Sequence, residues 1–288
     1  MSPQKDEAPA LAVVVLSHGP RASLCDAVRS LLRQDVEAEI VVVHSGAGDV
    51  RRLLNSAGLD VRVVHSDERL LPGAARNLGI SETRAPFIAF LADDCIAEQG
   101  WVGNRLRAHF AGSSAVASAL VCHQPANPVA LAAHLSLYFR RMPRAAPGAA
   151  LRYGVSYARR LFARHGSFRA DLESGEDTEF NRRLVGADAP TWAPEVVTVH
   201  RGADTLGSFF RGQFLRGRRM AKAWRALGIH HPVTVARDAL KRTDPIVRET
   251  WRLVEPRHRG AALLCIPLIV LGNLIYAWGA LRGEGRGA

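Results

Sequence analysis

The sequence is poor in the features that mark several common classes of protein. Its four cysteines are widely spaced, with no Cys-x-x-Cys pair and no Cys/His cluster, which argues against a zinc module. Residues 1–9 are polar and lack the basic-then-apolar order of a signal peptide. No internal repeat or low-complexity tract is visible. These absences favour a globular chain with reduced thiols, as in a cytoplasmic compartment.

Lysine is almost missing as well. Of the 38 lysine and arginine residues, only Lys5, Lys222 and Lys241 are lysines, and the formal net charge is +11. Such an excess favours an anionic partner, such as nucleotide phosphates or a membrane surface, although an arginine bias can equally reflect genomic base composition. No nucleic-acid recognition motif is present, so we expect no nucleic-acid partner.

Apolar runs alternate with helical patterns through the first half of the chain. We expect strands at residues 11–17, 37–46, 61–66 and 87–94, separated by helices at 21–34, 49–58 and 73–83. Continuous β-branched runs separated by helices predict a parallel sheet covered on both faces. Ligands of such sheets bind at the carboxyl ends of the strands.

Two carboxylates stand together at one of these strand ends. Asp93 and Asp94 directly follow the apolar run "FIAFLA". Partly buried like charges repel each other strongly, and a divalent cation with hard oxygen ligands resolves that conflict. The simpler alternative is an exposed turn with two solvated aspartates.

The last part of the chain contains a basic helical pattern at 207–228 and an uncharged run at 260–281. As a helix, the uncharged run would be roughly 33 Å long, which is about the thickness of a bilayer core. Pro267, Gly272 and Asn273 weaken the case for a plain spanning helix. A kinked span, a re-entrant hairpin, an interfacial segment and a buried core or oligomer helix all remain open.

Four segments, in this order, resemble family 2 glycosyltransferases of the GT-A fold, which transfer sugars from nucleotide-sugar donors. They are the opening strand–helix–strand at 11–46, "LPGAARNLGISETRAPFIAFLADDC", "YGVSYARRLFARHGSFRADLESGEDTEFNRRL" and "VVTVHR". The resemblance covers about residues 11–220. It implies an α/β GT-A fold with a mainly parallel sheet sandwiched by helices.

The resemblance also implies roles for individual residues. Asp93 and Asp94 fall on the metal motif and would hold Mg²⁺ or Mn²⁺ against the donor diphosphate, with His200 as a candidate third ligand. Asp177 falls on the general base of an inverting transfer, and Glu176 would orient it or the acceptor. The residues expected to contact the donor are Ser17, His44, Arg76, Asn77 and Asp93.

Each role has a structural alternative. Glu176 and Asp177 could be acids that favour a helix N-terminus through its dipole. His200 could be an ordinary histidine at a strand end. Gly73, at the start of the helix that carries Arg76, could serve only to let two backbone segments approach each other.

The sequence also departs from the family pattern. His44 and Ser45 stand where the family commonly has paired aspartates that read the uracil ring, and Ala92 replaces a further aspartate of the metal motif. No Gln-x-x-Arg-Trp motif of processive synthases is present, which favours a single transfer. The departures motivate an alternative, a non-catalytic nucleotide-sugar-binding or scaffold protein. A nucleotidyltransferase ranks last, because "SHGPRAS" lacks a glycine-rich loop with lysine.

These interpretations give three expected parts: a disordered N-terminus at 1–9, a GT-A domain at 10–225 and a helical extension at 226–288. The basic helix and the uncharged run favour membrane association, at the cytoplasmic face of a bacterial inner membrane. The expected partners are a nucleotide-sugar donor and an acceptor hydroxyl, for which a lipid-linked sugar is one candidate.

Overall fold

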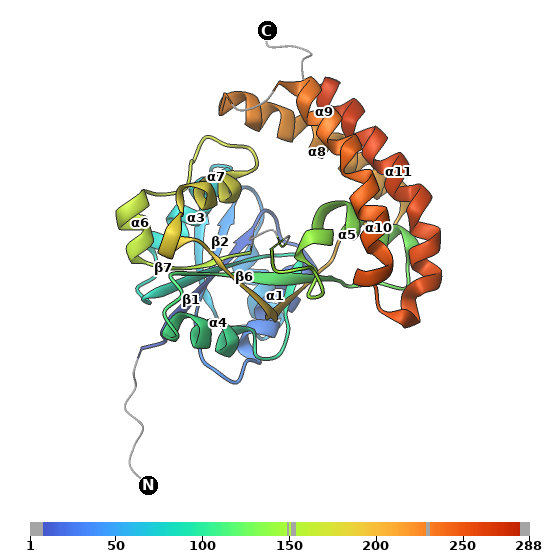
Figure 1. Ribbon diagram of the computed structural model, residues 1–288. Helices are drawn as coiled ribbons and strands as arrows, with labels where there is room; N and C mark the ends of the chain where they lie inside the picture. Colours follow the sequence, from blue (N-terminus) through green and yellow to red (C-terminus); the bar gives the residue numbers. More distant parts are fainter. Residues whose placement is uncertain (1–7, 149, 151–153, 229–230, 283–288) are drawn as a thin grey trace. The chain divides into compact units, whose positions relative to one another are not determined.

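The computed structural model describes all residues except 1–7, 149, 151–153, 229–230 and 283–288 (Figure 1). The chain divides into two compact units. Unit 1 comprises residues 1–119, 152–171 and 177–198, and unit 2 comprises residues 120–151, 172–176 and 199–288. Most of the N-terminus expected to be disordered lies outside the described residues, and the domain boundary expected at residue 225 stays a prediction.

One eight-stranded sheet runs through unit 1 in the order β3-β2-β1-β4-β7-β6-β8-β5. The strands are β1 Leu11–Ser17, β2 Glu39–Ser45, β3 Arg62–Ser66, β4 Phe87–Ala92, β5 Cys95–Ala97, β6 Ala115–Cys122, β7 Ser156–Ala158 and β8 Thr191–His200. The predicted strands β1 to β4 are parallel to one another. β7 is antiparallel to both β4 and β6, so the sheet is mixed. The last residues of β6 and β8 belong to unit 2.

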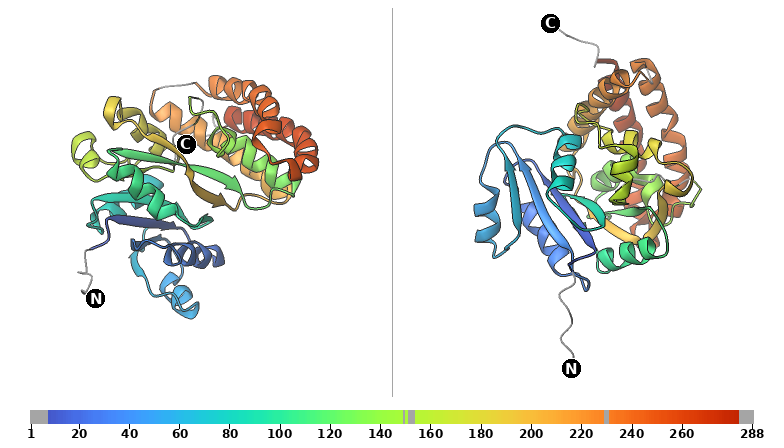
Figure 2. Two further views of the ribbon diagram at one scale, coloured as in Figure 1. Left: turned by 60° about the horizontal axis from the view of Figure 1, so that its bottom comes forward. Right: turned by 90° about the vertical axis from the view of Figure 1, so that its left-hand side faces the viewer.

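Helices cover both faces of the sheet, as the continuous apolar strands predict (Figure 2). Alternate side chains of β1 enter different cores, because successive residues of a strand point to opposite faces. Val13 and Val15 pack with α1 Ala22–Leu32, α2 Val50–Ser56 and α4 Trp101–Phe110. Val14 packs in the core that contains residues of α3 Pro72–Ser81, α6 Arg160–His165 and α7 Glu176–Arg183. The short helix η2 spans Gly186–Asp188.

Unit 2 is mainly helical. Its elements are α5 Pro128–Tyr138, η1 Phe139–Arg141, α8 Leu206–Ala226, α9 Pro232–Lys241, α10 Thr243–Leu253, η3 Pro256–His258 and α11 Arg259–Arg282. α8 begins with a capping box in which Thr205 and Ser208 bond each other's backbone, and it corresponds to the predicted basic helix. Among the described residues, one helical stretch, Pro256–Arg282, is long and apolar enough to cross a membrane.

Candidate active site

The carboxyl ends of four parallel strands bring several predicted site residues to one edge of the sheet in unit 1. In the register of the sheet, Ser17 pairs with His44 across β1 and β2, and His44 pairs with His65 across β2 and β3. On the other side of β1, the N–H of Asp93 donates to the carbonyl oxygen of Leu16 at 3.2 Å. Ser17, His44 and Asp93, all predicted to contact the donor, therefore share this edge.

Asp93 is nearly buried, with 7% of its surface exposed, and its Oδ2 has no hydrogen-bond partner among the described residues. Its Oδ1 lies 3.9 Å from the guanidinium of Arg21, a side chain that is mostly exposed. Burial, and then the charge of Asp94, raise the pKa of Asp93, while Arg21 opposes the shift. A carboxylate in this environment is stabilised by an added positive charge.

Asp94 follows β4 in a turn and is more exposed than Asp93. Its Oδ1 lies 3.5 Å from the Sγ of Cys95. Within the part of the chain that the structure describes, no group of three or more His, Cys, Asp and Glu is placed to hold a metal ion. The pair can still supply two hard oxygen ligands, which fits a cation that completes its shell with phosphate oxygens and water. Two carboxylates alone are too few for a metal site whose ligands all come from the protein.

His200, the candidate third ligand, ends β8 in unit 2. Its ring packs edge-on against the ring of Tyr138 at 4.9 Å and lies 6.4 Å from the ring of His134. The structure therefore gives His200 an aromatic environment, and its metal role stays a prediction.

His44 is fully buried at the end of β2. Burial first, and then the nearby His65, lower the pKa of His44, so the ring is neutral at pH 7. The two rings lie 5.1 Å apart, and the Nδ1 of His18 lies 3.4 Å from the Oγ of Ser45. A neutral imidazole thus occupies the place where the family pattern has a carboxylate.

Our reading of the sequence missed His18 and His65. The signal was available, because β1, β2 and β3 each end in adjacent serine and histidine residues, "SH", "HS" and "HS". Strands that are parallel neighbours place such dipeptides at the same edge of a sheet. The edge is therefore richer in imidazole than we expected.

The first turns of α3 contact the segment around Phe168. The amide of Asn77 donates to the carbonyl oxygen of Phe168 at 2.9 Å and accepts from its N–H at 3.1 Å. The guanidinium of Arg76 lies over the rings of Phe90 and Phe168, at 4.9 and 5.5 Å. A Cβ at Gly73 would overlap the carbonyl oxygen of Arg169, so the glycine permits a close backbone approach. These contacts give Arg76 and Asn77 a structural role, and their donor contacts stay predictions.

The acids Glu176 and Asp177 begin α7, as the sequence predicts. Glu176 is 5% exposed, whereas Asp177 is partly exposed. The Oδ1 of Asp177 accepts from the N–H of Thr178 at 2.7 Å. Negative charge at this end of a helix is stabilised by the helix dipole.

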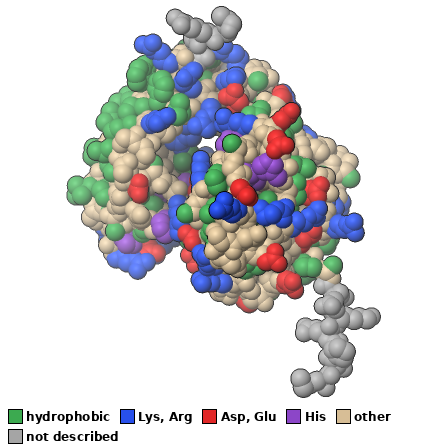
Figure 3. Space-filling view, turned by 180° about the vertical axis from the view of Figure 1, so that it is seen from behind, with side chains coloured by type: hydrophobic (Ala, Val, Ile, Leu, Met, Phe, Trp, Pro, Cys, Tyr) green, Lys and Arg blue, Asp and Glu red, His purple; other side chains and the backbone are tan. Residues whose placement is uncertain are grey.

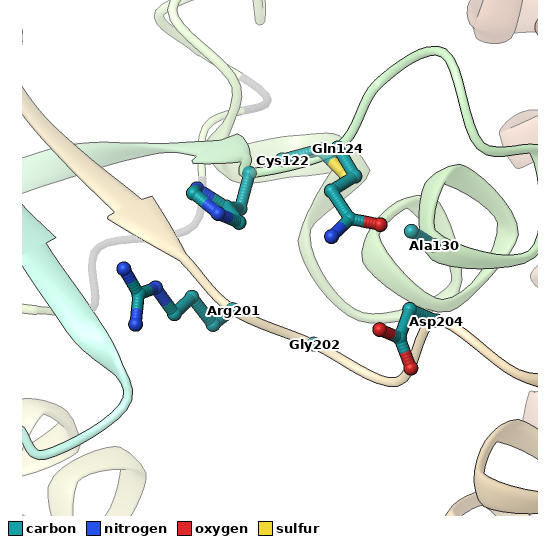
Figure 4. A pocket seen from close by; sticks show the side chains of 7 residues that line it. Cys122, Gln124, Ala130, Arg201, Gly202 and Asp204 are labelled. Atoms are coloured by element: carbon teal, nitrogen blue, oxygen red, sulfur yellow. The ribbon is translucent and has the colours of Figure 1, made fainter. Parts of the chain in front are cut away.

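Unit 2 contains a polar cavity of about 350 Å³ beside the end of β8 (Figure 4). Its lining residues are Cys122, His123, Gln124, Ala130, Arg201, Gly202 and Asp204. The N–H of His123 donates to the carbonyl oxygen of His200 at 3.2 Å, which joins the ends of the neighbouring strands β6 and β8. We did not predict this cavity, although "CHQ" and "HRG" follow the two strands in the sequence.

Comparison with the sequences of known proteins identifies the family of this chain. The model of "Glycosyl transferase family 2" matches residues 12–158, just over half of the chain. Pre-mycofactocin glycosyltransferase of Mycobacterium tuberculosis is 30% identical over 188 residues, which are 61% of this chain and 39% of that protein. Glycosyltransferase AglE of Haloferax volcanii is 25% identical over 211 residues, 69% of this chain and 68% of that protein. The chain thus spans about two fifths of the length of its mycobacterial relative.

Solved structures agree at the level of the fold. The mannosyltransferase PcManGT from Pyrobaculum calidifontis, solved with GDP-Man and Mn²⁺, has a TM-score of 0.65 at 15% identity. That match covers 100% of this chain and 90% of the neighbour. TarS residues 1–349 of S. aureus have a TM-score of 0.51 at 14% identity, covering 93% of this chain. With its GT-A fold and the family match over half its length, the chain belongs to glycosyltransferase family 2.

Proposed function

We propose that this protein transfers a single sugar from a nucleoside-diphosphate sugar to an acceptor hydroxyl, with inversion and with the help of a divalent cation. The observation that carries the proposal is the nearly buried Asp93, which lies beside Asp94 at the carboxyl edge of the sheet and whose Oδ2 has no hydrogen-bond partner in the described part of the chain. Carboxylates in this place suit Mg²⁺ or Mn²⁺ bound together with a diphosphate.

The donor is proposed from the fold and from what its neighbours bind. PcManGT was solved with GDP-Man and Mn²⁺, and a TarS structure with UDP-GlcNAc. In this chain the buried His44 stands where a nucleobase-reading carboxylate is expected, and the ring of His65 lies 5.1 Å from it. A ring that stacks or forms one hydrogen bond discriminates among bases differently from a carboxylate, so we do not assign a uridine nucleotide.

The chemistry assigned to the residues is a displacement at the anomeric carbon. Asp177 accepts the proton of the acceptor hydroxyl while that oxygen attacks from the face opposite the leaving group. The new bond joins the acceptor oxygen to the anomeric carbon, the bond to the diphosphate oxygen breaks, and the configuration inverts. Asp93 and Asp94 would hold the cation, which when bound neutralises charge on the departing diphosphate. Glu176 would position Asp177.

The acceptor and the location are proposed from unit 2. The polar cavity beside β8 contains hydrogen-bonding groups of both kinds, including Arg201, Gln124 and Asp204, and it suits hydroxyl-bearing ligands (Figure 4). The apolar helix α11 favours work at a membrane, so a lipid-linked acceptor at the cytoplasmic face of a bacterial inner membrane is the acceptor that we propose. The absence of the Gln-x-x-Arg-Trp motif supports a single transfer.

Replacement of the proposed base tests the mechanism. Asp177→Asn should lower kcat by about 10² to 10⁴, because general-base catalysis supplies a factor of that order. The affinity for the nucleoside diphosphate should stay unchanged. Glu179→Gln, on the same helix and paired with Arg183 at 3.0 Å, is the matched control and should transfer normally.

Two results would contradict the proposal. Transfer by Asp177→Asn at the wild-type rate would remove Asp177 as the base. Failure of the wild type to release any nucleoside diphosphate from a donor panel that includes GDP-mannose and UDP-N-acetylglucosamine, with Mn²⁺ present, would favour the scaffold alternative.

A further inference from the structure

One face of α11 is apolar and exposed over its whole length. The exposed side chains are Leu263, Leu264, Pro267, Val270, Leu271, Leu274, Trp278 and Leu281. Steps of three and four residues along a helix return to the same face, so these side chains form one continuous row. We call this row the outer stripe. Figure 3 shows hydrophobic side chains gathered on the side of the molecule where α11 lies, with basic side chains nearby.

The opposite face of α11 is part of the core of unit 2. Ala262, Cys265 and Ile269 are fully buried there. A Cβ at Gly217 of α8 would overlap the carbonyl oxygen of Tyr276, and a Cβ at Gly279 would overlap the carbonyl oxygen of Phe214. The backbones of α8 and α11 therefore touch directly, and α11 cannot leave α8 without a loss of close packing.

α8 carries several cations that a bilayer core would exclude. The exposed basic residues of this helix are Arg211, Arg218, Arg219, Lys222 and Arg225. If α11 crossed a membrane with its packing intact, α8 would enter the hydrocarbon with it. Charged side chains at that depth are strongly unfavourable, and a helix that carries them belongs at the surface. A spanning α11 is therefore inconsistent with its contacts to α8.

We propose that α11 lies in the plane of an anionic membrane surface, with the outer stripe inserted at the boundary between headgroups and acyl chains. Arg259 and Arg282 are exposed at the two ends of the helix, and the guanidinium of Arg282 lies 5.8 Å from the ring centre of Trp278. Arginine and tryptophan at the edge of an apolar face suit the headgroup region. The net charge of +11 favours an anionic leaflet.

This inference deepens the membrane location that we propose above and leaves the sugar chemistry aside. It says that the protein rests on one leaflet and that a defined row of side chains makes the contact. A test without donor or acceptor therefore separates its failure from a failure of the catalytic proposal.

Vesicle co-sedimentation tests the contact. The full chain should bind phosphatidylcholine vesicles that contain phosphatidylglycerol, and bind pure phosphatidylcholine more weakly. Leu264→Glu combined with Leu271→Glu should reduce binding by at least about tenfold, since it places two charges in the inserted face. Phe110→Glu combined with Val185→Glu, two exposed apolar side chains of unit 1, is the matched control and should bind as the wild type does.

Two outcomes overturn the contact. Unchanged vesicle binding by the stripe variant would show that another surface meets the lipid. Self-association of the wild type that is lost in the stripe variant, measured by sedimentation velocity without lipid, would show that a second copy covers the stripe. Circular dichroism and thermal unfolding of both variants establish that they are folded.

The depth of single labels decides between lying and spanning. Fluorophores on cysteines placed at Leu264, Leu271 and Leu281, with Cys122 replaced by serine, are quenched by spin labels at known acyl depths. These positions span roughly 26 Å along a helix, so a spanning helix would place Leu271 deep and the other two shallow. An in-plane helix places all three at one depth, within about 5–10 Å of the headgroups. A label at Leu271 that lies deeper than those at Leu264 and Leu281 would overturn the proposal.

Discussion

Asp93 combines two properties at the scale of a single residue: it is nearly buried, and one of its carboxylate oxygens has no hydrogen-bond partner among the described residues. The raised pKa has the same origin, because burial and Asp94 both disfavour the charged form. A bound cation would oppose both effects and lower the pKa of Asp93.

Replacement of Asp94 tests whether the two aspartates hold a cation. In Asp94→Ala, loss of one of two oxygen ligands should weaken Mn²⁺-dependent binding of a nucleoside diphosphate by at least about tenfold. Isothermal titration with and without Mn²⁺ measures the effect. Asp60→Ala, an exposed aspartate before β3, is the control. If Mn²⁺ changes the affinity of neither the wild type nor Asp94→Ala, the two aspartates do not hold the cation.

His109 should contribute to how the stability of the protein depends on pH. Its ring is buried between Ser113 and Ser156, with Nδ1 2.8 Å from the carbonyl oxygen of Ser113 and Nε2 2.8 Å from the Oγ of Ser156. Burial, assisted by Arg105 and Arg160, lowers the pKa of His109 to about 4, although the Ser113 carbonyl opposes the shift. An unfolded histidine titrates near 6.5.

The sign of the effect follows. Between about pH 6.5 and 4 the unfolded chain binds a proton that native His109 does not, so the free energy of unfolding falls as pH falls through this window. The contribution of His109 is up to about 3 kcal/mol, because one pKa unit corresponds to about 1.4 kcal/mol. Urea unfolding at pH 7, 5.5 and 4.5 should show the loss, and the loss should be smaller in His109→Gln. An equally steep decline in His109→Gln, with half-exposed His258→Gln as control, would contradict this assignment.

At the scale of elements, the parallel strands β1 to β4 and the helices between them could be predicted, because their signals are local. Continuous β-branched runs and 3.6-residue periodicity fall within each segment. The antiparallel direction and the partner of β7 could not be predicted in the same way. This strand has three residues, Ser156–Ala158, and its partner β4 lies more than sixty residues earlier in the chain. Only tertiary pairing determines that position.

The same contrast applies to the candidate site. Local sequence patterns predicted Ser17, His44 and Asp93 at the ends of strands, and the register of the sheet brings these ends to one edge. The two hydrogen bonds between Asn77 and the backbone of Phe168 join residues 91 positions apart, so no local sequence pattern could predict them. Asn77 therefore illustrates how a plausible ligand contact can be a structural bond between two segments.

Two glycines of α8 test how closely this helix must approach α11. A Cβ at Gly217 would overlap the backbone of Tyr276, whereas a Cβ at Gly212 would have no atom within 4 Å. Gly212→Ala should raise the free energy of unfolding by up to about 1 kcal/mol, because alanine favours a helix. Gly217→Ala should lower it by on the order of 1–3 kcal/mol, because it overpacks the contact. Chemical denaturation measures both, and a stabilised Gly217→Ala would contradict the close approach.

At the scale of the whole molecule, the sequence left open whether the uncharged run spans, lies on a membrane or is buried. The reason is physical: the run is apolar on every side, so its periodicity contains no information about orientation. Only the packing of α8, α5 and α9 against it separates the buried face from the outer stripe. Deletion of 260–281 would remove core residues such as Cys265 and Ile269, so substitutions in the stripe are the better test.

The distance along the chain between elements that pack together also constrains the order in which the protein can fold during synthesis. The chain passes between the units after residues 119, 151, 171, 176 and 198. β5 lies beside β8 at the edge of the sheet, although β5 is complete at Ala97 and β8 begins only at Thr191. At ribosomal rates of about 5–20 residues per second, roughly 5–20 s pass between the synthesis of β5 and the start of β8. During that interval a nascent chain exposes an unpaired edge strand, and a chaperone that shields such edges would raise the yield of this enzyme.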